Sequence, residues 1–136
     1  LGRKLSNFAD IPTEVEIDGE LIRFKNVESL WFYLKIYLSL NEKDINLLDM
    51  EGYEAKEYGT KKTKLIPPLK EEQKTYFIEK IKEGIKWKIL NNDALLEEFK
   101  ANQGKIPYAH YYNYSGNVRT LVGAEWLVNF LNDLRF

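Results

Sequence analysis

One twelve-residue stretch, "TEVEIDGELIRF", constrains the fold more than any other feature of this sequence. Apolar and polar residues alternate over Thr13–Ile17 and again over Glu20–Phe24, which is the period of a β-strand with one buried face. The dipeptide Asp18-Gly19 between them suits a type I′ turn, because both central residues of that turn need a positive φ. The sequence therefore predicts a tight β-hairpin with one face packed on the rest of the chain.

Helical patterns follow the hairpin. Asn26 is a favourable N-cap for a helix that extends to about Leu40. Gly59 is a suitable left-handed residue to end a short helix over residues 51–59. A Pro-Pro pair at 67–68 separates this helix from a longer one over about 69–90. Isoleucines at helical spacing predict the buried stripe of the longer helix: Ile78, Ile81, Ile85 and Ile89.

The C-terminal part continues the mostly helical pattern. A helix is expected from Asp93 to about Asn102, before Gly104, and residues 106–118 form an aromatic, turn-rich segment that favours a strand and hairpin. Residues 1–12 lack a regular pattern. The expected fold class is α+β, mostly α, with about five helices and one small N-terminal β-hairpin. The last helix, over about 123–134, is expected to pack through Trp126, Leu127, Phe130 and Leu131.

Length and composition bound the function. A chain of 136 residues with 44% hydrophobic residues is expected to form a single domain over residues 1–136. Its net charge of −1 supplies no global attraction to nucleic acid or anionic lipid. No apolar run approaches the roughly 20 residues of a membrane span, no targeting segment is recognisable, and cysteine is absent. These features favour an intracellular, cytoplasmic protein without a membrane partner.

The segment "KNVESLWFYLK" places one acid, Glu28, in the first turn of an aromatic helix. At about 100° per residue, Glu28, Trp31, Phe32 and Lys35 share a flank beside a purely apolar stripe. Glu28 and Lys35 are about 10 Å apart along the axis, so both can reach one ligand but not each other. Glu28 either complements the helix dipole or acts as a general acid or base whose pKa is raised by neighbouring aromatics.

Two further segments carry polar groups beside aromatic residues. In "LSNFA", Ser6 and Asn7 offer hydrogen-bonding groups on a loop that Phe8 can anchor, and the loop is either a structural turn or part of a binding site. In "YAHYYNY", alternation puts His110 and Tyr112 on one face, which either packs internally or stacks on a base or ribose. One histidine and no cysteine pair cannot form a typical metal site, so no metal is expected.

Surface features leave a third possibility open. Lysines cluster over residues 61–70 and 80–88, where they are interpreted mainly as solvated surface residues. Trp87 lies about 180° from Ile78 on the predicted helix, off the core stripe. A mostly exposed tryptophan indicates a contact site, so a protein-interaction module is an alternative function.

Taken in order, these motifs resemble the NADAR family of N-glycosidases. "LSNFA" resembles the opening S-N-F motif of the family, "EIDGELIRF" its hairpin, and "VESLWFYLK" its V/S-E-H-Y-F-Q-A-Q-K signature. "AKEYG" resembles its A-x-x-x-G-R segment, and the likeness extends over roughly residues 4–102. The chain departs from the family at several places, where it has Ser29 for histidine, Phe32 for glutamine, Thr60 for arginine and Gln73 for tryptophan.

The resemblance implies a hydrolase that removes ADP-ribose or a related ribosyl group from a base, without a cofactor. Its substrate would be an ADP-ribose-containing nucleotide or ADP-ribosylated nucleic acid. Glu28 would be the catalytic carboxylate, which stabilises the positive charge on the sugar while water is activated, and Lys35 would hold a phosphate or form a Schiff base. A catalytically inactive protein that binds ADP-ribose-type nucleotides is the alternative. The implied ligand-binding residues are Ser6, Asn7, Phe8, Trp31 and Lys61, with His110 and Tyr112 added from the tyrosine-rich segment.

Overall fold

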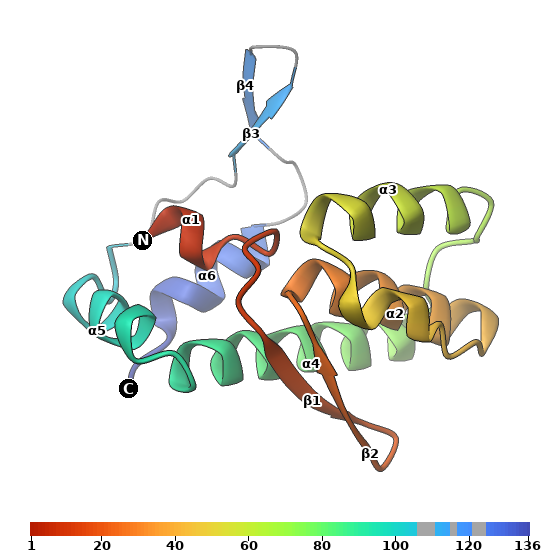
Figure 1. The fold of residues 1–136 in the computed structure, drawn as a ribbon, viewed down its shortest axis with the longest axis horizontal. Coiled ribbons are helices and arrows are strands. Elements are labelled where there is room, and N and C mark those ends of the chain that lie inside the picture. Colours follow the sequence, from red (N-terminus) through yellow and green to blue (C-terminus); the bar gives the residue numbers. More distant parts are fainter. Residues whose placement is uncertain (106–110, 115–116, 121–124) are drawn as a thin grey trace. The chain divides into compact units, whose positions relative to one another are not determined.

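The computed structural model describes residues 1–105, 111–114, 117–120 and 125–136, with side chains in 1–105 and 125–136. The chain divides into two compact units, Leu1–Leu95 and Leu96–Phe136. The predicted fold class, α+β and mostly α with a small N-terminal hairpin, is confirmed (Figure 1). The single domain over residues 1–136 stays a prediction.

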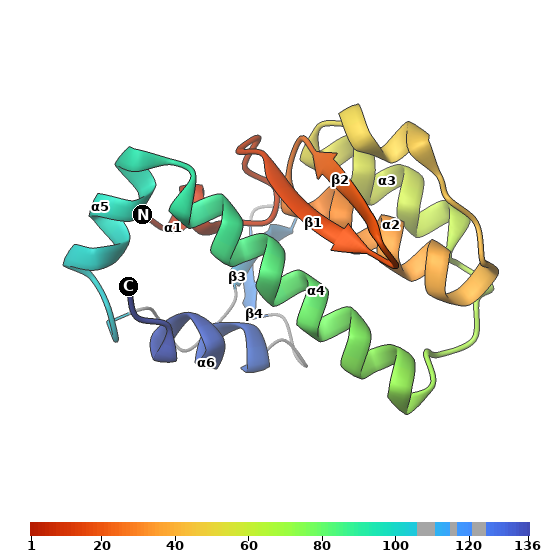
Figure 2. The same ribbon diagram turned by 90° about the horizontal axis from the view of Figure 1, so that it is seen from below.

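The N-terminal hairpin has the predicted strands and turn. Strands β1 (Thr13–Ile17) and β2 (Glu20–Phe24) pair antiparallel, with Val15 opposite Ile22. Asp18 and Gly19 have φ of 48° and 88°, as a type I′ turn requires. Alternate residues are buried, and β1 packs against helix α4 (Glu71–Leu90; Figure 2).

Helix α2 (Val27–Leu40) is the central element of the first unit. It contacts α3 (Gly52–Lys62) and α4, and the views of Figures 1 and 2 agree with these contacts. Asn26 caps its start as predicted, and Asn41 ends it in the left-handed conformation with φ 53°. Most of its side chains are buried, including Val27, Leu30 and Leu34 of the predicted apolar stripe.

Helix α3 corrects the prediction that Gly59 ends a short helix. The helix continues to Lys62, and Gly59 lies inside it, buried against the ring of Phe32. A Cβ at position 59 would lie 2.7 Å from the Cβ of Phe32. Glycine is required here because two helices approach closely and not because the backbone is left-handed. The sequence pattern around Gly59 does not show this contact, so it wrongly predicted the end of the helix.

Helix α4 buries Ile81, Ile85 and Ile89 as predicted, while Ile78 is half-buried. Its Gly84 carbonyl accepts a hydrogen bond from the Thr13 hydroxyl at 2.7 Å, which fixes the helix against β1.

The prediction that Trp87 is mostly exposed is wrong. The Trp87 ring is half-buried, and the guanidinium of Arg23 on β2 lies 5.4 Å from the centre of the ring. The helical wheel placed Trp87 off the core stripe correctly, but it could not show that a side chain of the neighbouring hairpin covers the ring.

Short elements complete the first unit. Residues 1–12 are not wholly irregular, because α1 (Gly2–Leu5) forms one helical turn. A 3₁₀ helix, η1 (Ile45–Asp49), begins where the Asp44 carboxylate accepts a hydrogen bond from the Asn46 amide. Both elements are shorter than the two or three turns that a hydrophobic period needs to be recognised.

Helix α5 (Asp93–Ala101) begins in the first unit and continues into the second. It is followed by Gly104 with φ 75°, by strands β3 (Tyr111–Tyr114) and β4 (Asn117–Thr120), and by α6 (Glu125–Asp133). The two strands pair antiparallel, as the predicted hairpin requires. On α6 the predicted Leu127 and Leu131 are buried, whereas Trp126 and Phe130 are half-buried, and Val128 and Asn132 join the buried face.

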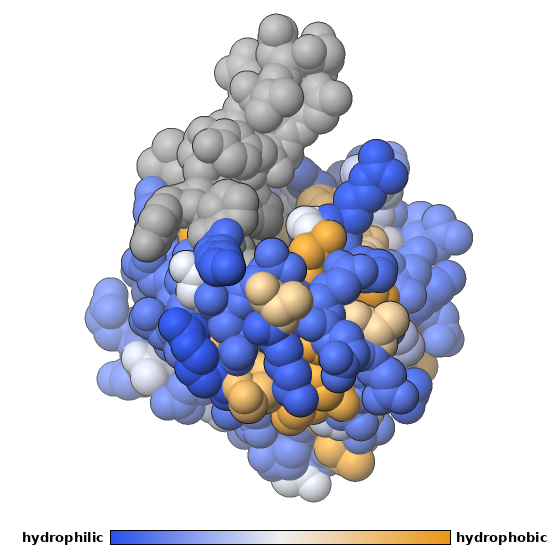
Figure 3. Space-filling model, turned by 90° about the vertical axis from the view of Figure 1, so that its left-hand side faces the viewer, coloured by the Kyte–Doolittle hydropathy of each residue, from blue (hydrophilic) through white to orange (hydrophobic). Residues whose placement is uncertain are grey.

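The face shown in Figure 3 is mostly hydrophilic, with hydrophobic patches between hydrophilic side chains. None of the helices that the structure describes combines the length and the apolar character of a membrane span.

Candidate functional site around Glu28

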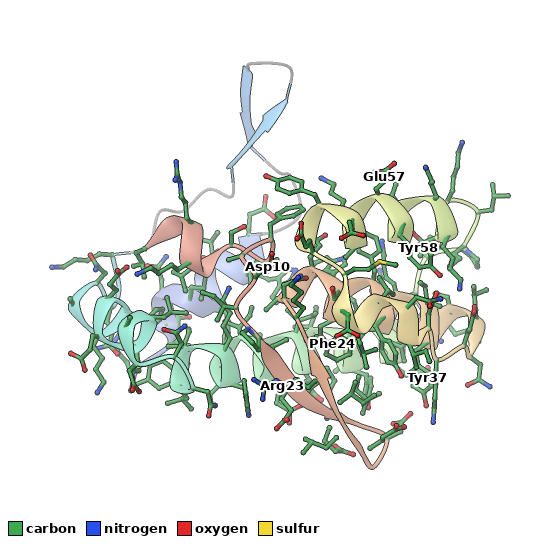
Figure 4. The ribbon with its side chains drawn as sticks, in the orientation of Figure 1. Asp10, Arg23, Phe24, Tyr37, Glu57 and Tyr58 are labelled. Atoms are coloured by element: carbon green, nitrogen blue, oxygen red, sulfur yellow. The ribbon has the colours of Figure 1, made fainter. Side chains whose placement is uncertain are left out.

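The cap of α2 sets the position of Glu28. The Asn26 side chain accepts a hydrogen bond from the Ser29 amide at 2.8 Å and donates to Asp10 at 3.0 Å and to the Met50 carbonyl at 2.8 Å. Figure 4 labels Asp10 beside this helix start. The amide of Glu28 has no partner within its own helix and donates to the Asn7 carbonyl at 2.9 Å. The N-terminal loop therefore crosses the first turn of α2 at Glu28.

Glu28 is buried, with 9% of its surface exposed. Burial raises the pKa of its carboxyl from the usual 4.5 to about 7, because the charged form loses water. The positive charges of Lys56 and Lys35 oppose this shift, and no hydrogen bond from the described part of the chain contributes to it. Glu28 is therefore a buried acid in the first turn of α2 and not a solvated one, and its role as a dipole partner or as a general acid or base stays a prediction.

Residues 6–8 form a loop, and each of these residues contacts a different part of the first unit. The Ser6 hydroxyl accepts a hydrogen bond from the Phe8 amide at 3.2 Å, and the Ser6 carbonyl accepts one from the ammonium of Lys88 at 2.9 Å. Asn7 is buried, and its carbonyl binds the Glu28 amide. The ring of Phe8 stacks on Tyr53 of α3, with 4.9 Å between the ring centres. The structure thus brings Ser6, Asn7 and Phe8 together with Glu28.

Lys56 on α3 is a member of this site that the sequence analysis missed. Its ammonium lies 5.4 Å from the centre of the Phe8 ring, and its charge lowers the pKa of Glu28. The sequence could have indicated Lys56, because it lies in "AKEYG", three residues before the glycine that resembles the family motif.

The structure does not bring Lys61 to Glu28. Lys61 pairs with Glu57 at 3.3 Å, and Figure 4 shows Glu57 on the side of α3 that points away from α2. Lys61 also lines a shallow cavity of about 290 Å³ with Met50, Glu54, Glu57 and Tyr58. Positions 56 and 61 are five residues apart, which corresponds to about 140° around a helix, so only one of them can face Glu28.

Lys35 follows Phe32 by about one turn of α2. Its ammonium is 5.8 Å from the centre of the Phe32 ring, and its charge still acts on Glu28. Lys35 lines a cavity of about 150 Å³ with Ser39, Thr63, Ile66, Pro67, Pro68 and Leu69. The charge of Lys35 therefore acts on Glu28, while its side chain lines a separate small cavity.

Trp31 faces α4. Its ring packs edge to face on Phe77 at 4.8 Å between centres, and it is half-buried. Phe32, which the sequence placed on the same flank, is buried against Gly59 of α3. The predicted flank is therefore divided between two helices, with Glu28, Phe32 and Lys35 on the α3 side.

Lys88 is the second residue that the sequence analysis missed. It was interpreted as solvated, yet only 1% of its surface is exposed, and burial lowers the pKa of its ammonium from 10.5 to about 8. Its spacing of seven residues from Ile81 and three from Ile85 places it on the buried stripe of α4. This spacing indicated a buried position, but a lysine is usually solvated, so the sequence analysis did not assign Lys88 to the core. Lys80 is also buried, and it pairs with Glu16 at 3.2 Å and Glu83 at 2.9 Å.

The side chains of the tyrosine-rich segment lie outside the described part of the chain. His110 lies outside the described residues. Tyr112 belongs to β3, where it pairs with Arg119, but its side chain lies outside the described part. Their contribution to ligand binding stays a prediction.

The arrangement joins a buried carboxyl, a polar loop and two lysines. A carboxyl with a pKa near 7 exchanges protons at neutral pH, which is the property of a general acid or base. The neighbouring ammonium groups favour an anionic ligand. No family model matches the chain, and neither a curated protein nor a solved structure shows significant similarity to it.

Proposed function

We propose that this protein is a hydrolase that cleaves the N-glycosidic bond of an ADP-ribosylated base, releasing ADP-ribose from guanine in nucleic acid. The observation that carries the proposal is Glu28, a buried carboxyl with a pKa of about 7 beneath a Ser-Asn-Phe loop and beside two lysines. The resemblance of these residues to the NADAR motifs supplies the substrate class.

In the proposed reaction, the bond between the anomeric carbon of the ribose and the base nitrogen breaks. The bonding electron pair leaves with the base, and positive charge builds up on the sugar. The ionised Glu28 stabilises this charge and takes a proton from the attacking water, whose oxygen forms the new bond to carbon. The base nitrogen gains a proton, so the hydroxyl group of the water ends on the sugar and a proton ends on the base.

The other members of the site have binding roles. Lys56 and Lys35 bear positive charges that act on Glu28 and attract the diphosphate of the ligand. Asn7 hydrogen-bonds the ribose or diphosphate through its amide side chain. Lys88 is a positioning residue, because its ammonium holds the Ser6 carbonyl and with it the loop.

The direct test uses DNA that carries ADP-ribosylated guanine, with release of free ADP-ribose as the readout. The wild-type protein is expected to release ADP-ribose, and Glu28→Gln is expected to lower the rate by at least about 100-fold. Glu79→Gln, which changes an exposed acid on α4, is the matched control and should keep the full rate. If wild type and Glu28→Gln both stay at background, the proposal fails.

A non-catalytic nucleotide binder is the second candidate, and one observation favours it. Ser29 stands where the family has histidine, and its hydroxyl donates to the Met50 carbonyl at 3.2 Å. This side chain therefore serves the packing of α2 and cannot replace an imidazole. Titration calorimetry with ADP-ribose distinguishes the two candidates, since tight binding without turnover supports the binder.

A further inference from the structure

Tyr53 is an exposed aromatic residue beside the buried acid. It lies in the first turn of α3, and 78% of its surface is exposed. One face of its ring is covered by Phe8, with an angle of 25° between the ring planes. The exposed fraction leaves the other face open to a flat ligand.

The position of this aromatic pair is fixed by the backbone. A Cβ on Gly52 would lie 2.6 Å from the Phe8 carbonyl oxygen, so the loop and the start of α3 touch without a side chain between them. Gly52 precedes Tyr53, and Asn7, which binds the Glu28 amide, precedes Phe8. The backbone segments that bear the two stacked rings are therefore in direct contact, and the segment that bears Phe8 is hydrogen-bonded to the first turn of α2.

Lys56 connects the aromatic pair to Glu28. Its ammonium lies 5.4 Å from the Phe8 ring, and its charge acts on the Glu28 carboxyl. Phe8 thus contacts both Tyr53 and Lys56, and Lys56 in turn acts on Glu28, so an exposed aromatic ring, a cation and a buried acid are linked across the N-terminal loop, α3 and α2. An aromatic base joined to an anionic sugar phosphate complements this combination, because every base has a face that stacks on an aromatic side chain.

We propose that Tyr53, backed by Phe8, stacks on the nucleobase from which the ribosyl group is released, while Lys56 binds the phosphate side of the ligand. This rests on the proposed function and adds a base-binding subsite to it. The subsite engages the base and not the ADP-ribose that remains after cleavage. Loss of Tyr53 should therefore weaken binding of the substrate but leave binding of free ADP-ribose intact.

The test compares two constants in the same variants. Tyr53→Ala is expected to raise the KM for a single-stranded oligonucleotide carrying ADP-ribosyl-guanine by roughly 5- to 140-fold, the loss of one stacked base. The inhibition constant of free ADP-ribose should stay unchanged. Tyr53→Phe should restore the wild-type KM because it keeps the ring, and Leu65→Ala, at an exposed apolar residue elsewhere, should change neither constant.

Two outcomes overturn the subsite alone. If wild type cleaves the oligonucleotide and Tyr53→Ala has the same KM, Tyr53 does not bind the base. If Tyr53→Ala weakens binding of substrate and of ADP-ribose by the same factor, the residue supports the binding site as a whole and the base-specific role is wrong.

A failure of the proposed hydrolase activity is recognised separately. If wild type releases no ADP-ribose, binding of the labelled oligonucleotide is measured by fluorescence anisotropy with wild type, Tyr53→Ala and Tyr53→Phe. Weaker binding by Tyr53→Ala, restored in Tyr53→Phe, supports the stacking subsite although catalysis is absent. Binding that does not depend on Tyr53 overturns the subsite together with the activity.

Discussion

Glu28 destabilises the folded protein at neutral and alkaline pH. The folded pKa of about 7 is above the unfolded value of 4.5, so the folded protein holds a proton that the unfolded chain releases between these values. The free energy of unfolding therefore falls as pH rises through this window, by up to about 3 kcal/mol, and stays lowered above it. A residue kept at such a cost is more readily explained by function than by stability.

We expect Glu28→Gln to be more stable than wild type at pH 8, by up to about 3 kcal/mol, and equal to it near pH 4. The neutral amide removes the charge that burial penalises. Urea unfolding at both pH values measures the difference, with Glu79→Gln as the exposed control. An equal effect of Glu28→Gln at pH 4 and pH 8 would contradict the raised pKa.

Lys88 has the opposite pH dependence. Its folded pKa of about 8 is below the unfolded value of 10.5, so between these values the unfolded chain binds the extra proton. The free energy of unfolding contributed by this group therefore rises with pH across the window, by about 3 kcal/mol.

We expect Lys88→Met to lack this rise. The difference in unfolding free energy between wild type and Lys88→Met should shift in favour of wild type by about 3 kcal/mol from pH 8 to pH 10.5. Denaturant unfolding at a series of pH values measures it, and Lys86→Met, at an exposed position on the same helix, should show no such shift. A constant difference for Lys88→Met would mean that its ammonium is not desolvated.

At the scale of elements, the contact of α2 with α3 depends on the absence of a side chain at Gly59. Alanine is the better helix former by about 1 kcal/mol in an exposed helix. At position 59 the added Cβ would meet the Cβ of Phe32 at 2.7 Å and collide with its ring. Packing between the helices therefore reverses the sign that helix propensity alone would give.

We expect Gly59→Ala to destabilise the protein by about 1–3 kcal/mol, because inserting a methyl group into a close contact forces the helices apart. Thermal or urea unfolding monitored by circular dichroism measures the loss. Gly2→Ala is the matched control, since a Cβ there has no neighbour within 4 Å and the residue also lies in a helix. A stability gain in Gly59→Ala would show that the two helices are not in close contact.

At the scale of the whole molecule, the described site lies within the unit Leu1–Leu95. Its parts come from the loop at residues 6–8, from α2, from α3 and, through Lys88, from α4. The pKa of Glu28 is a property of this assembly, because burial raises it and a lysine of another helix lowers it.

We expect kcat of the proposed hydrolase to rise with pH through about 7, as Glu28 loses its proton and becomes the active carboxylate. In Lys56→Met the pKa of Glu28 should rise, since a lowering charge is gone, and the rising limb should move to higher pH. Steady-state rates from pH 5 to pH 9 measure the shift, and Lys61→Met should leave the limb in place. A profile that falls through pH 7 would assign the protonated form to catalysis instead.

Much of the fold was predictable because it depends on neighbours in the chain. The Asp18-Gly19 turn, the Asn26 cap and the isoleucine stripe of α4 all specify local conformation or a buried face, and the structure has all three. Glu28 was recognised as a candidate for the same reason, since its first-turn position follows from the cap.

Tertiary packing alone decided the electrostatics of the site. It selected Lys56 over Lys61 as the cation beside Glu28 and buried the Glu28 carboxyl. The same packing brought Gly59 into a contact between two helices, where the sequence had indicated the end of a helix. Backbone conformation depends mainly on short-range preferences, so a sequence encodes it within a few residues. Burial and charge proximity depend on how helices distant in sequence meet, so the pKa of Glu28 was determined only when the elements packed.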